Sequence, residues 1–263
     1  MRHFDDWPLR WKMLALIVMV SALPLALTAV VEWRESNQLS ESSTESLLQA
    51  NAEDIGSDLD FLNDGFQRSV ARLSRQPAVI RLLQHPGTGA ETKDVADIIQ
   101  AYVASDARLR GVALLNPAGT IIFASEPAMV GSNLGFRRYF RDAVHGDLSI
   151  PDMLVSTREE GSTPLIAYAT PVRSGGTVSG VAVVYARATA MWDIVRQGNG
   201  RAGAGSFAVV LDQHGLILAH GSDAAEVFHP GGRLTAAEID LMVEEHRFGE
   251  GTRALVEQAQ PLE

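Results

Sequence analysis

Residues 112–123 read VALLNPAGTIIF, two apolar runs separated by a short break. Asn116 opens this break, Pro117 follows it, and Gly119 closes it. Asn, Pro and Gly favour the backbone dihedral angles that reverse the chain direction, and this is why they are common in tight turns. The sequence therefore predicts a β-hairpin at this position.

The segments around this hairpin predict an α+β fold. Apolar residues recur with helical spacing over Val95–Tyr102, and a second helical stretch, Phe136–His145, ends at Gly146. Further strands are predicted at Met153–Thr157, Leu165–Pro171 and Ser179–Ala186, with turns at 159–162 and 173–176. A hairpin, a helix and a three-stranded meander make up a PAS-like module, an antiparallel sheet with helices on one side. We assign this membrane-distal module to residues 85–192.

The hairpin pattern returns near the C-terminus. Phe207–Leu211 and Leu216–Ala219 are apolar, and the turn between them starts with Asp212 and ends with Gly215. A helix is predicted at Ala236–Glu245. We therefore expect a partial, membrane-proximal module at residues 206–263. Its strands are too few to complete a sheet, so we expect the natural chain to continue beyond it.

A glycine-rich connector, residues 193–205, joins the two modules. Within it, residues 198–203 match the pattern GxGxxG. A dinucleotide site requires a strand before this pattern and a helix after it. Here the predicted helix precedes the pattern and the strand follows it, which favours a flexible connector.

Residues 32–84 predict a long stalk helix with a kink or break at Gln76-Pro77. Apolar residues recur at intervals of seven and form two rows offset by four, the pattern of a helix that buries one narrow stripe. The stripe packs either on the chain's own domain or on a second copy in a parallel homodimer, and both arrangements can hold along different stretches. The two rows are Leu48, Ile55 and Leu62, and Ala52, Leu59, Phe66 and Leu73.

The N-terminal region predicts a membrane anchor. Residues 13–31 contain no charge and would form a helix of about 28 Å, close to the roughly 30 Å thickness of the bilayer core. Arg2, Arg10 and Lys12 precede the segment, so residues 1–12 are expected to be a cytoplasmic tail and residues 32–263 to be periplasmic. The alternative is a cleaved signal peptide, but the apolar run is long for one and no clean cleavage site follows.

Composition excludes several function classes. The chain has 22 basic and 32 acidic residues and a formal charge of −10, which disfavours nucleic-acid binding. It has no cysteine, which excludes disulfides, thiolate metal sites and a Cys nucleophile. His214, His220 and His229 lack metal-ligand spacing, and no Gly-x-Ser-x-Gly elbow occurs. We therefore expect no enzymatic activity, no metal and no cofactor.

Three segments in order resemble the double Cache family of bacterial extracellular sensor domains. They are GSNLGFRRYFRDAVHG at 131–146, PLIAYATPV at 164–172 and GVAV at 180–183. Members of this family typically carry Arg-x-Tyr-Phe at a helix start, an apolar strand ending in Pro-Val, and a Gly-Val strand. The resemblance covers roughly residues 32–263, and the residues that match are Arg137, Tyr139, Phe140, Pro171, Val172, Gly180 and Val181.

The resemblance implies a ligand pocket in the membrane-distal module, between the sheet and the segment with Arg137, Tyr139 and Phe140. A guanidinium can hold a carboxylate with two parallel hydrogen bonds, while Tyr139 offers a hydroxyl and Phe140 an apolar wall. Tyr168 is a candidate for the opposite wall. The alternative for Arg137 is a surface residue paired with a carboxylate such as Asp142.

Two departures from the family pattern bear on the ligand. Members that bind amino acids carry an acidic residue near the end of the Gly-Val strand, where this chain reads VYAR at 184–187. They also carry an aromatic residue five positions before the arginine, where this chain has Ser132. These departures favour a small carboxylate over an amino acid.

Together these patterns predict the extracytoplasmic input region of a bacterial inner-membrane receptor of the histidine kinase, chemoreceptor or cyclase type. Its partners would be a small, anionic ligand, the membrane through residues 13–31, and a second copy through the stalk. Two alternatives remain. One is a membrane-anchored interaction module without a small ligand, and the other is an exported enzyme.

Overall fold

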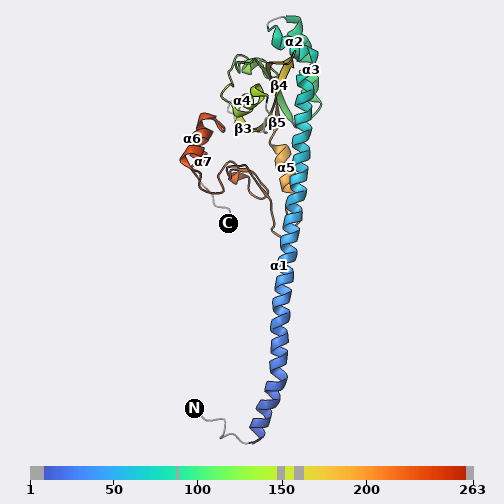
Figure 1. Ribbon diagram of the computed structural model, residues 1–263, viewed down its shortest axis with the longest axis vertical. Coiled ribbons are helices and arrows are strands. Elements are labelled where there is room, and N and C mark those ends of the chain that lie inside the picture. Colours follow the sequence, from blue (N-terminus) through green and yellow to red (C-terminus); the bar gives the residue numbers. More distant parts are fainter. Residues whose placement is uncertain (1–8, 87–88, 147–151, 157–162, 259–263) are drawn as a thin grey trace.

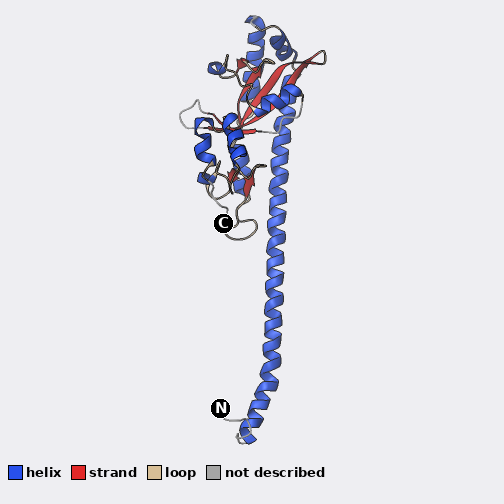
Figure 2. Ribbon diagram, turned by 60° about the vertical axis from the view of Figure 1, so that its left-hand side comes forward, coloured by secondary structure: helices blue, strands red, loops and turns tan. Residues whose placement is uncertain are grey.

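The computed structural model describes residues 9–86, 89–146, 152–156 and 163–258. Within the first helix, side chains are described from residue 43 onward and at a few earlier positions. This helix, α1 (Leu9–Ser74), is the long axis of the molecule, and the other elements gather around its C-terminal part (Figures 1 and 2). The lower half of α1 extends away from them in both views.

The break predicted at Gln76-Pro77 is confirmed. Helix α1 ends at Ser74, and α2 (Pro77–Gln84) begins at the proline. Proline suits the first turn of a helix, because its missing N–H would have no partner there, and it holds the preceding residue extended. Gln76 accordingly has φ −66° and ψ 128°.

The apolar stripe of α1 packs on the chain's own domain along residues 55–73. Ile55, Leu62, Phe66 and Leu73 are all buried in one core. Leu48, which lies earlier in the same row, is 46% exposed. The own-domain alternative therefore holds for the C-terminal stretch, and a homodimer contact stays a prediction for the stretch before it.

A five-stranded antiparallel sheet forms the centre of the first module. The strand order is β2-β1-β5-β4-β3, and every neighbouring pair is antiparallel. The predicted hairpin and meander are therefore confirmed, apart from the turn at 159–162, which lies outside the described residues. The strands are β1 (Leu109–Leu115), β2 (Ile121–Ala124), β3 (Asp152–Ser156), β4 (Thr163–Ser174) and β5 (Thr177–Arg187).

Helices cover both faces of this sheet, so the prediction of helices on one side only is wrong. The side chains of each strand alternate between two cores. One core lies against α1, α2 and α3 (Gly89–Ala104), which includes the predicted helix 95–102. The other lies against α4 (Arg138–His145), which ends at Gly146 with φ 93° as the sequence predicted.

The C-terminal residues form a smaller unit with its own core, Leu216, Met242, Phe248 and Val256. We call residues 206–258 the second unit, and it lies beside the first module toward the N-terminal half of α1 (Figures 1 and 2). Helix α5 (Thr189–Gln197) precedes it and extends into the segment assigned to the connector. The helices and strands of the second unit are β6 (Val209–Leu211), β7 (Ile217–His220), α6 (Ala236–Glu244) and α7 (Thr252–Val256).

The second unit repeats the first hairpin at the level of hydrogen bonds. In the first turn, the Asn116 side chain accepts from the backbone N–H groups of residues 118 and 120, at 3.0 Å each. In the second, the Asp212 side chain accepts from those of residues 214 and 216, at 2.8 and 2.9 Å. Gly119 and Gly215 close the turns with φ 83° and 79°. The predicted repeat of the hairpin is confirmed, while a complete second module stays a prediction.

The predicted membrane segment lies only partly within the described part of the structure. Most side chains of residues 13–31 lie outside the described ones, as do residues 1–8 of the predicted cytoplasmic tail. In the part of the chain that the structure describes, no helical stretch has the length and hydropathy of a membrane span.

Candidate functional site

A cavity of about 110 Å³ lies between the sheet and the segment that leads from β2 into α4. A cavity volume of about 10–15 Å³ is enough for one water molecule, so this cavity has room for a molecule of several non-hydrogen atoms. Apolar side chains from four strands form much of its lining, and seven of the fourteen lining residues carry a charge or a hydroxyl group. The residues that line it are Arg110, Gly111, Val112, Ile121, Ser125, Glu126, Met129, Ser132, Leu134, Arg137, Tyr139, Leu154, Leu165 and Tyr185.

Arg137 lies at the start of α4 and lines this cavity. Its backbone carbonyl accepts from the N–H groups of residues 140 and 141, and its side chain takes no part in capping the helix. Nη1 donates to the carbonyl oxygens of Glu245 and His246, at 3.2 and 2.9 Å. Nε is buried and has no hydrogen-bond partner among the described residues. Because a buried donor without a partner is costly, this N–H is the strongest indication of a ligand.

The alternative partner considered for Arg137 is engaged elsewhere. Asp142 lies 3.7 Å from Nε of Arg138, one turn away on the same helix. Asp142 is therefore paired with Arg138 and not with Arg137.

Tyr139 also lines the cavity, and it meets a tyrosine that the sequence analysis did not select. Its hydroxyl lies 3.1 Å from that of Tyr185, and the two rings pack edge to face with centroids 6.4 Å apart. Tyr185 stands on β5 within the segment 184–187, where the family resemblance implies an acid in members that bind amino acids. In this chain a phenol therefore occupies that part of the wall.

Phe140 and Tyr168 do not line this cavity. Phe140 is 4% exposed and belongs to the core between α4 and the sheet. Tyr168 faces the opposite side of the sheet, where its ring packs on Phe66 and its hydroxyl donates to Oδ1 of Asn63 at 2.6 Å. Burial raises the pKa of Tyr168 far above its ordinary value of 10.0, so it stays a neutral hydrogen-bond donor.

Arg110 and Glu126 add two opposite charges to the cavity lining. Their nearest nitrogen and oxygen lie 4.0 Å apart, and both side chains are partly exposed. The sequence analysis missed both. Arg110 lies just before the apolar run of the hairpin, and Glu126 lies just after its second strand, so their approach depends on the pairing of β1 with β2.

A larger and more open groove, about 530 Å³, runs along α1 beside Asp106 and Arg108. Asp106 and Arg108 form an ion pair of 2.7 Å, and hydrogen bonding to Arg108 lowers the pKa of Asp106. No buried side-chain polar atom of the groove residues lacks a partner. The cavity at Arg137 is therefore the better candidate site. Among the described residues, no group of histidine and carboxylate side chains has the arrangement of a metal site.

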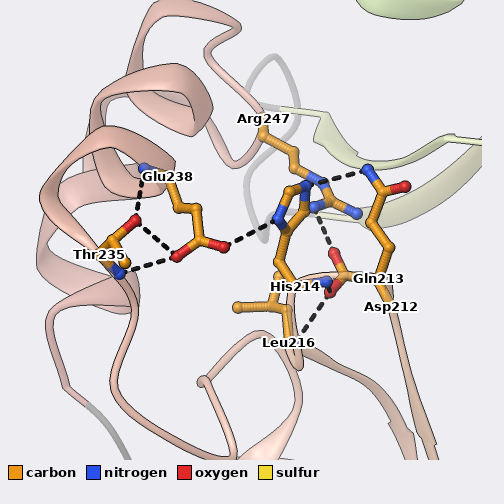
Figure 3. Close-up of polar contacts among 7 residues, drawn as sticks. All are labelled: Asp212, Gln213, His214, Leu216, Thr235, Glu238 and Arg247. Carbon is orange, nitrogen blue, oxygen red and sulfur yellow. Dashed lines mark hydrogen bonds and ion pairs between the residues drawn. The ribbon is translucent and has the colours of Figure 1, made fainter.

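A polar network in the second unit holds the segment that contacts Arg137 (Figure 3). Arg247 and Asp212 form an ion pair of 2.6 Å with side chains only 10% and 9% exposed. Nearby, His214 lies 3.3 Å from Glu238, whose carboxylate also accepts from the backbone and hydroxyl of Thr235 at the start of α6. These contacts fix the second hairpin and α6 relative to each other.

Several solved structures share this arrangement of helices and sheet. The sensor domain of the V. cholerae histidine kinase DctB superposes with a TM-score of 0.62 and 18% identity, over 76% of this chain and 75% of that one. The sensory domain of the Campylobacter jejuni chemoreceptor Tlp3 with isoleucine bound gives a TM-score of 0.53 and 16% identity, over 71% and 74% of the two chains. The chain has the fold of bacterial sensor domains.

This sensor-domain fold is also that of the extracellular domain of vpHK1S-Z8, named as a histidine kinase, with a TM-score of 0.53 and 13% identity over 82% of this chain and 77% of that one. The sensor-domain fold implied by the resemblance is thereby confirmed, while a complete second module stays a prediction. No protein-family model matches the sequence, and no curated protein does. At these identities the likeness concerns the fold, and the ligand has to be argued from the cavity.

Proposed function

We propose that this chain is the extracytoplasmic, ligand-sensing region of a bacterial membrane receptor, and that its cavity binds a small molecule with a carboxylate group. The buried, unpartnered Nε of Arg137 is the observation that supports a carboxylate ligand. A guanidinium presents five N–H donors, and the hydrogen bonds of Arg137 to the carbonyls of Glu245 and His246 use Nη1. This leaves Nε and Nη2, the two nitrogens of one guanidinium edge, to hold a carboxylate with two parallel hydrogen bonds.

The rest of the lining fits a short molecule with an apolar portion. Leu154, Leu165 and Ile121 line the cavity on the sheet side, and Tyr139 and Tyr185 supply hydroxyl groups. An apolar wall combined with convergent charged and hydroxyl groups is typical of a small-molecule site. Tlp3 was solved with isoleucine, so an amino acid belongs in any test even though the acid expected on β5 is absent here.

The experiment is isothermal titration of the full chain in detergent with acetate, propionate, malonate and isoleucine, with propionamide as a neutral control. We expect at least one carboxylate to bind and propionamide not to bind. Arg137→Ala should weaken that binding about 10- to 100-fold, since a hydrogen bond to a charged group contributes about 1.5–3 kcal/mol. Arg138→Ala is the matched control and should bind normally. Absence of binding by all four compounds contradicts the proposal.

The proposal includes a membrane anchor at residues 13–31, with the N-terminus cytoplasmic and residues 32–263 outside. It also includes a homodimer that forms through α1, and the exposed leucines at 47 and 48 support it. Reporter fusions at residues 8 and 258 test the topology. Leu48→Glu, with the nearby Glu45→Gln as control, tests the dimer by light scattering, and only Leu48→Glu should shift the mass toward that of the monomer.

A further inference from the structure

Three consecutive residues after α6 connect the second unit to the first module, and we call residues 245–247 the clasp. The backbone carbonyls of Glu245 and His246 accept from Nη1 of Arg137, and the carboxylate of Glu245 pairs with Arg141. The ring of His246 also packs edge to face on that of Phe136. Arg247 completes the connection through contacts outside α4.

Arg247 ties the clasp to both units. Its Nε donates to the carbonyl of Met153 on the edge strand β3, at 3.4 Å, and its Nη1 pairs with Asp212 in the second hairpin. Leu154, the residue after Met153, lines the ligand cavity. The clasp therefore contacts two elements of the first module, α4 and β3, that each supply a residue to the cavity lining.

The backbone of the clasp is held in an uncommon conformation. His246 has φ 48°, which residues other than glycine rarely adopt. Such a conformation persists only where surrounding contacts fix it. The clasp is thus an element whose docked state depends on its partners, and Arg137 is one of them.

Arg137 is shared between the clasp and the cavity. The clasp holds the guanidinium at Nη1, whereas Nε is buried, lacks a partner among the described residues and belongs to a side chain that lines the cavity. The guanidinium is planar and rigid, so a group bound at one edge fixes the direction of the other edge.

We infer that the clasp couples ligand binding in the cavity to docking of the second unit, through opposite edges of Arg137. This inference rests on the proposed function, since it requires a carboxylate at the Nε edge. Because the guanidinium is rigid and the two contacts use different atoms, a carboxylate at one edge holds the other edge in the direction that the docked clasp needs, and the two stabilise each other. Linkage makes the effect reciprocal: the ligand protects the clasp by the same factor by which the clasp raises ligand affinity.

Hydrogen exchange of the full chain in detergent tests this coupling. The backbone N–H groups of His246 and Arg247 bond to the carbonyls of Val243 and Met242, so their exchange reports on the clasp. The probes are acetate, propionate, malonate and isoleucine, each at a saturating concentration. We expect a carboxylate that binds to slow exchange at these two positions by about fivefold or more, the lower limit of typical coupling between sites.

Arg141→Gln provides the reciprocal measurement, because it removes the ion pair with Glu245 and leaves Arg137 and the cavity lining unchanged. It should weaken carboxylate binding by about fivefold or more. Arg138→Gln, on the same helix and paired there with Asp142, is the control and should leave binding and exchange unchanged.

Each outcome decides the inference. Slower clasp exchange together with weaker binding by Arg141→Gln supports it. A carboxylate that binds without any change in clasp exchange overturns the coupling and leaves the proposed function standing. If none of the four probes binds, both the proposed function and the coupling are overturned.

Discussion

The hydroxyl groups of Tyr139 and Tyr185 lie 3.1 Å apart, although the two residues are separated by 46 positions in the chain. One comes from α4 and the other from β5, and both line the candidate cavity. Tyr168, on the neighbouring strand β4, has its hydroxyl on the opposite face of the sheet, bonded to Asn63. The two faces therefore separate the proposed binding role of Tyr139 from the structural role of Tyr168.

Tyr139→Phe and Tyr168→Phe should accordingly have different effects. Tyr139→Phe removes a hydroxyl from the cavity wall and should weaken carboxylate binding about 5- to 10-fold, the value of one hydrogen bond. Tyr168→Phe leaves Oδ1 of Asn63 without its donor and should lower the free energy of unfolding by about 1–2 kcal/mol at unchanged affinity. Titration calorimetry and urea unfolding measure the two effects. If Tyr168→Phe weakened carboxylate binding and Tyr139→Phe did not, the assignment of binding to one face of the sheet would be contradicted.

The internal repeat gives a matched pair of glycine substitutions. Gly119 and Gly215 occupy equivalent turn positions with φ 83° and 79°. A Cβ atom at Gly119 would lie 2.5 Å from the Cα of Gly135, whereas one at Gly215 would meet nothing within 4 Å. We expect Gly215→Ala to lower the free energy of unfolding by about 1–2 kcal/mol, because alanine is strained in the left-handed backbone conformation. Gly119→Ala should lower it by about 2–5 kcal/mol, because overpacking against residue 135 adds to this strain. Equal losses in urea unfolding would argue against the close approach at residue 135.

The ion pair between Asp212 and Arg247 should be the most sensitive polar contact in the second unit. Both side chains are about nine-tenths buried, and removal of one partner leaves an uncompensated charge. Arg247→Met should therefore lower the free energy of unfolding by about 3–5 kcal/mol. Arg253→Met is the control, since its pairs with Asp240 and Glu257 are at least half exposed on both sides and should contribute little to stability.

A double-mutant cycle separates this pair from its surroundings. Asp212→Asn combined with Arg247→Met should be less destabilising than the sum of the two single changes, because asparagine still accepts from the backbone of residues 214 and 216 without burying a charge. Strict additivity of the unfolding free energies would mean that the two charges do not interact.

Glu238 should make the start of α6 sensitive to acid. Hydrogen bonds from the backbone and hydroxyl of Thr235, and then from His214, lower the pKa of Glu238 from its ordinary value of 4.5. Since the folded pKa lies below the unfolded one, this stabilisation is complete above about pH 4.5 and is lost as pH falls through the lowered pKa. Glu238→Gln should remove this pH dependence from the amide exchange of α6. A measured pKa at or above 4.5 would be inconsistent with the capping contacts.

The sequence was sufficient wherever local contacts decide the structure. The turns at 116–119 and 212–215, the break at Pro77 and the end of α4 at Gly146 were all predicted, because proline, glycine and side-chain caps act within a few residues. The Arg-x-Tyr-Phe resemblance likewise selected Arg137 and Tyr139, which both line the cavity.

Only the tertiary structure decided which face each strand residue occupies. A shift of one residue moves a side chain to the other side of a sheet, so the apolar pattern of β4 could not by itself assign Tyr168 to the face covered by α1. The same holds for Tyr185, Arg110 and Glu126, whose places depend on pairing between strands distant in sequence. The contact of Arg137 with the carbonyl of His246 spans 109 residues and uses a backbone atom that every residue has, so no residue pattern could reveal it.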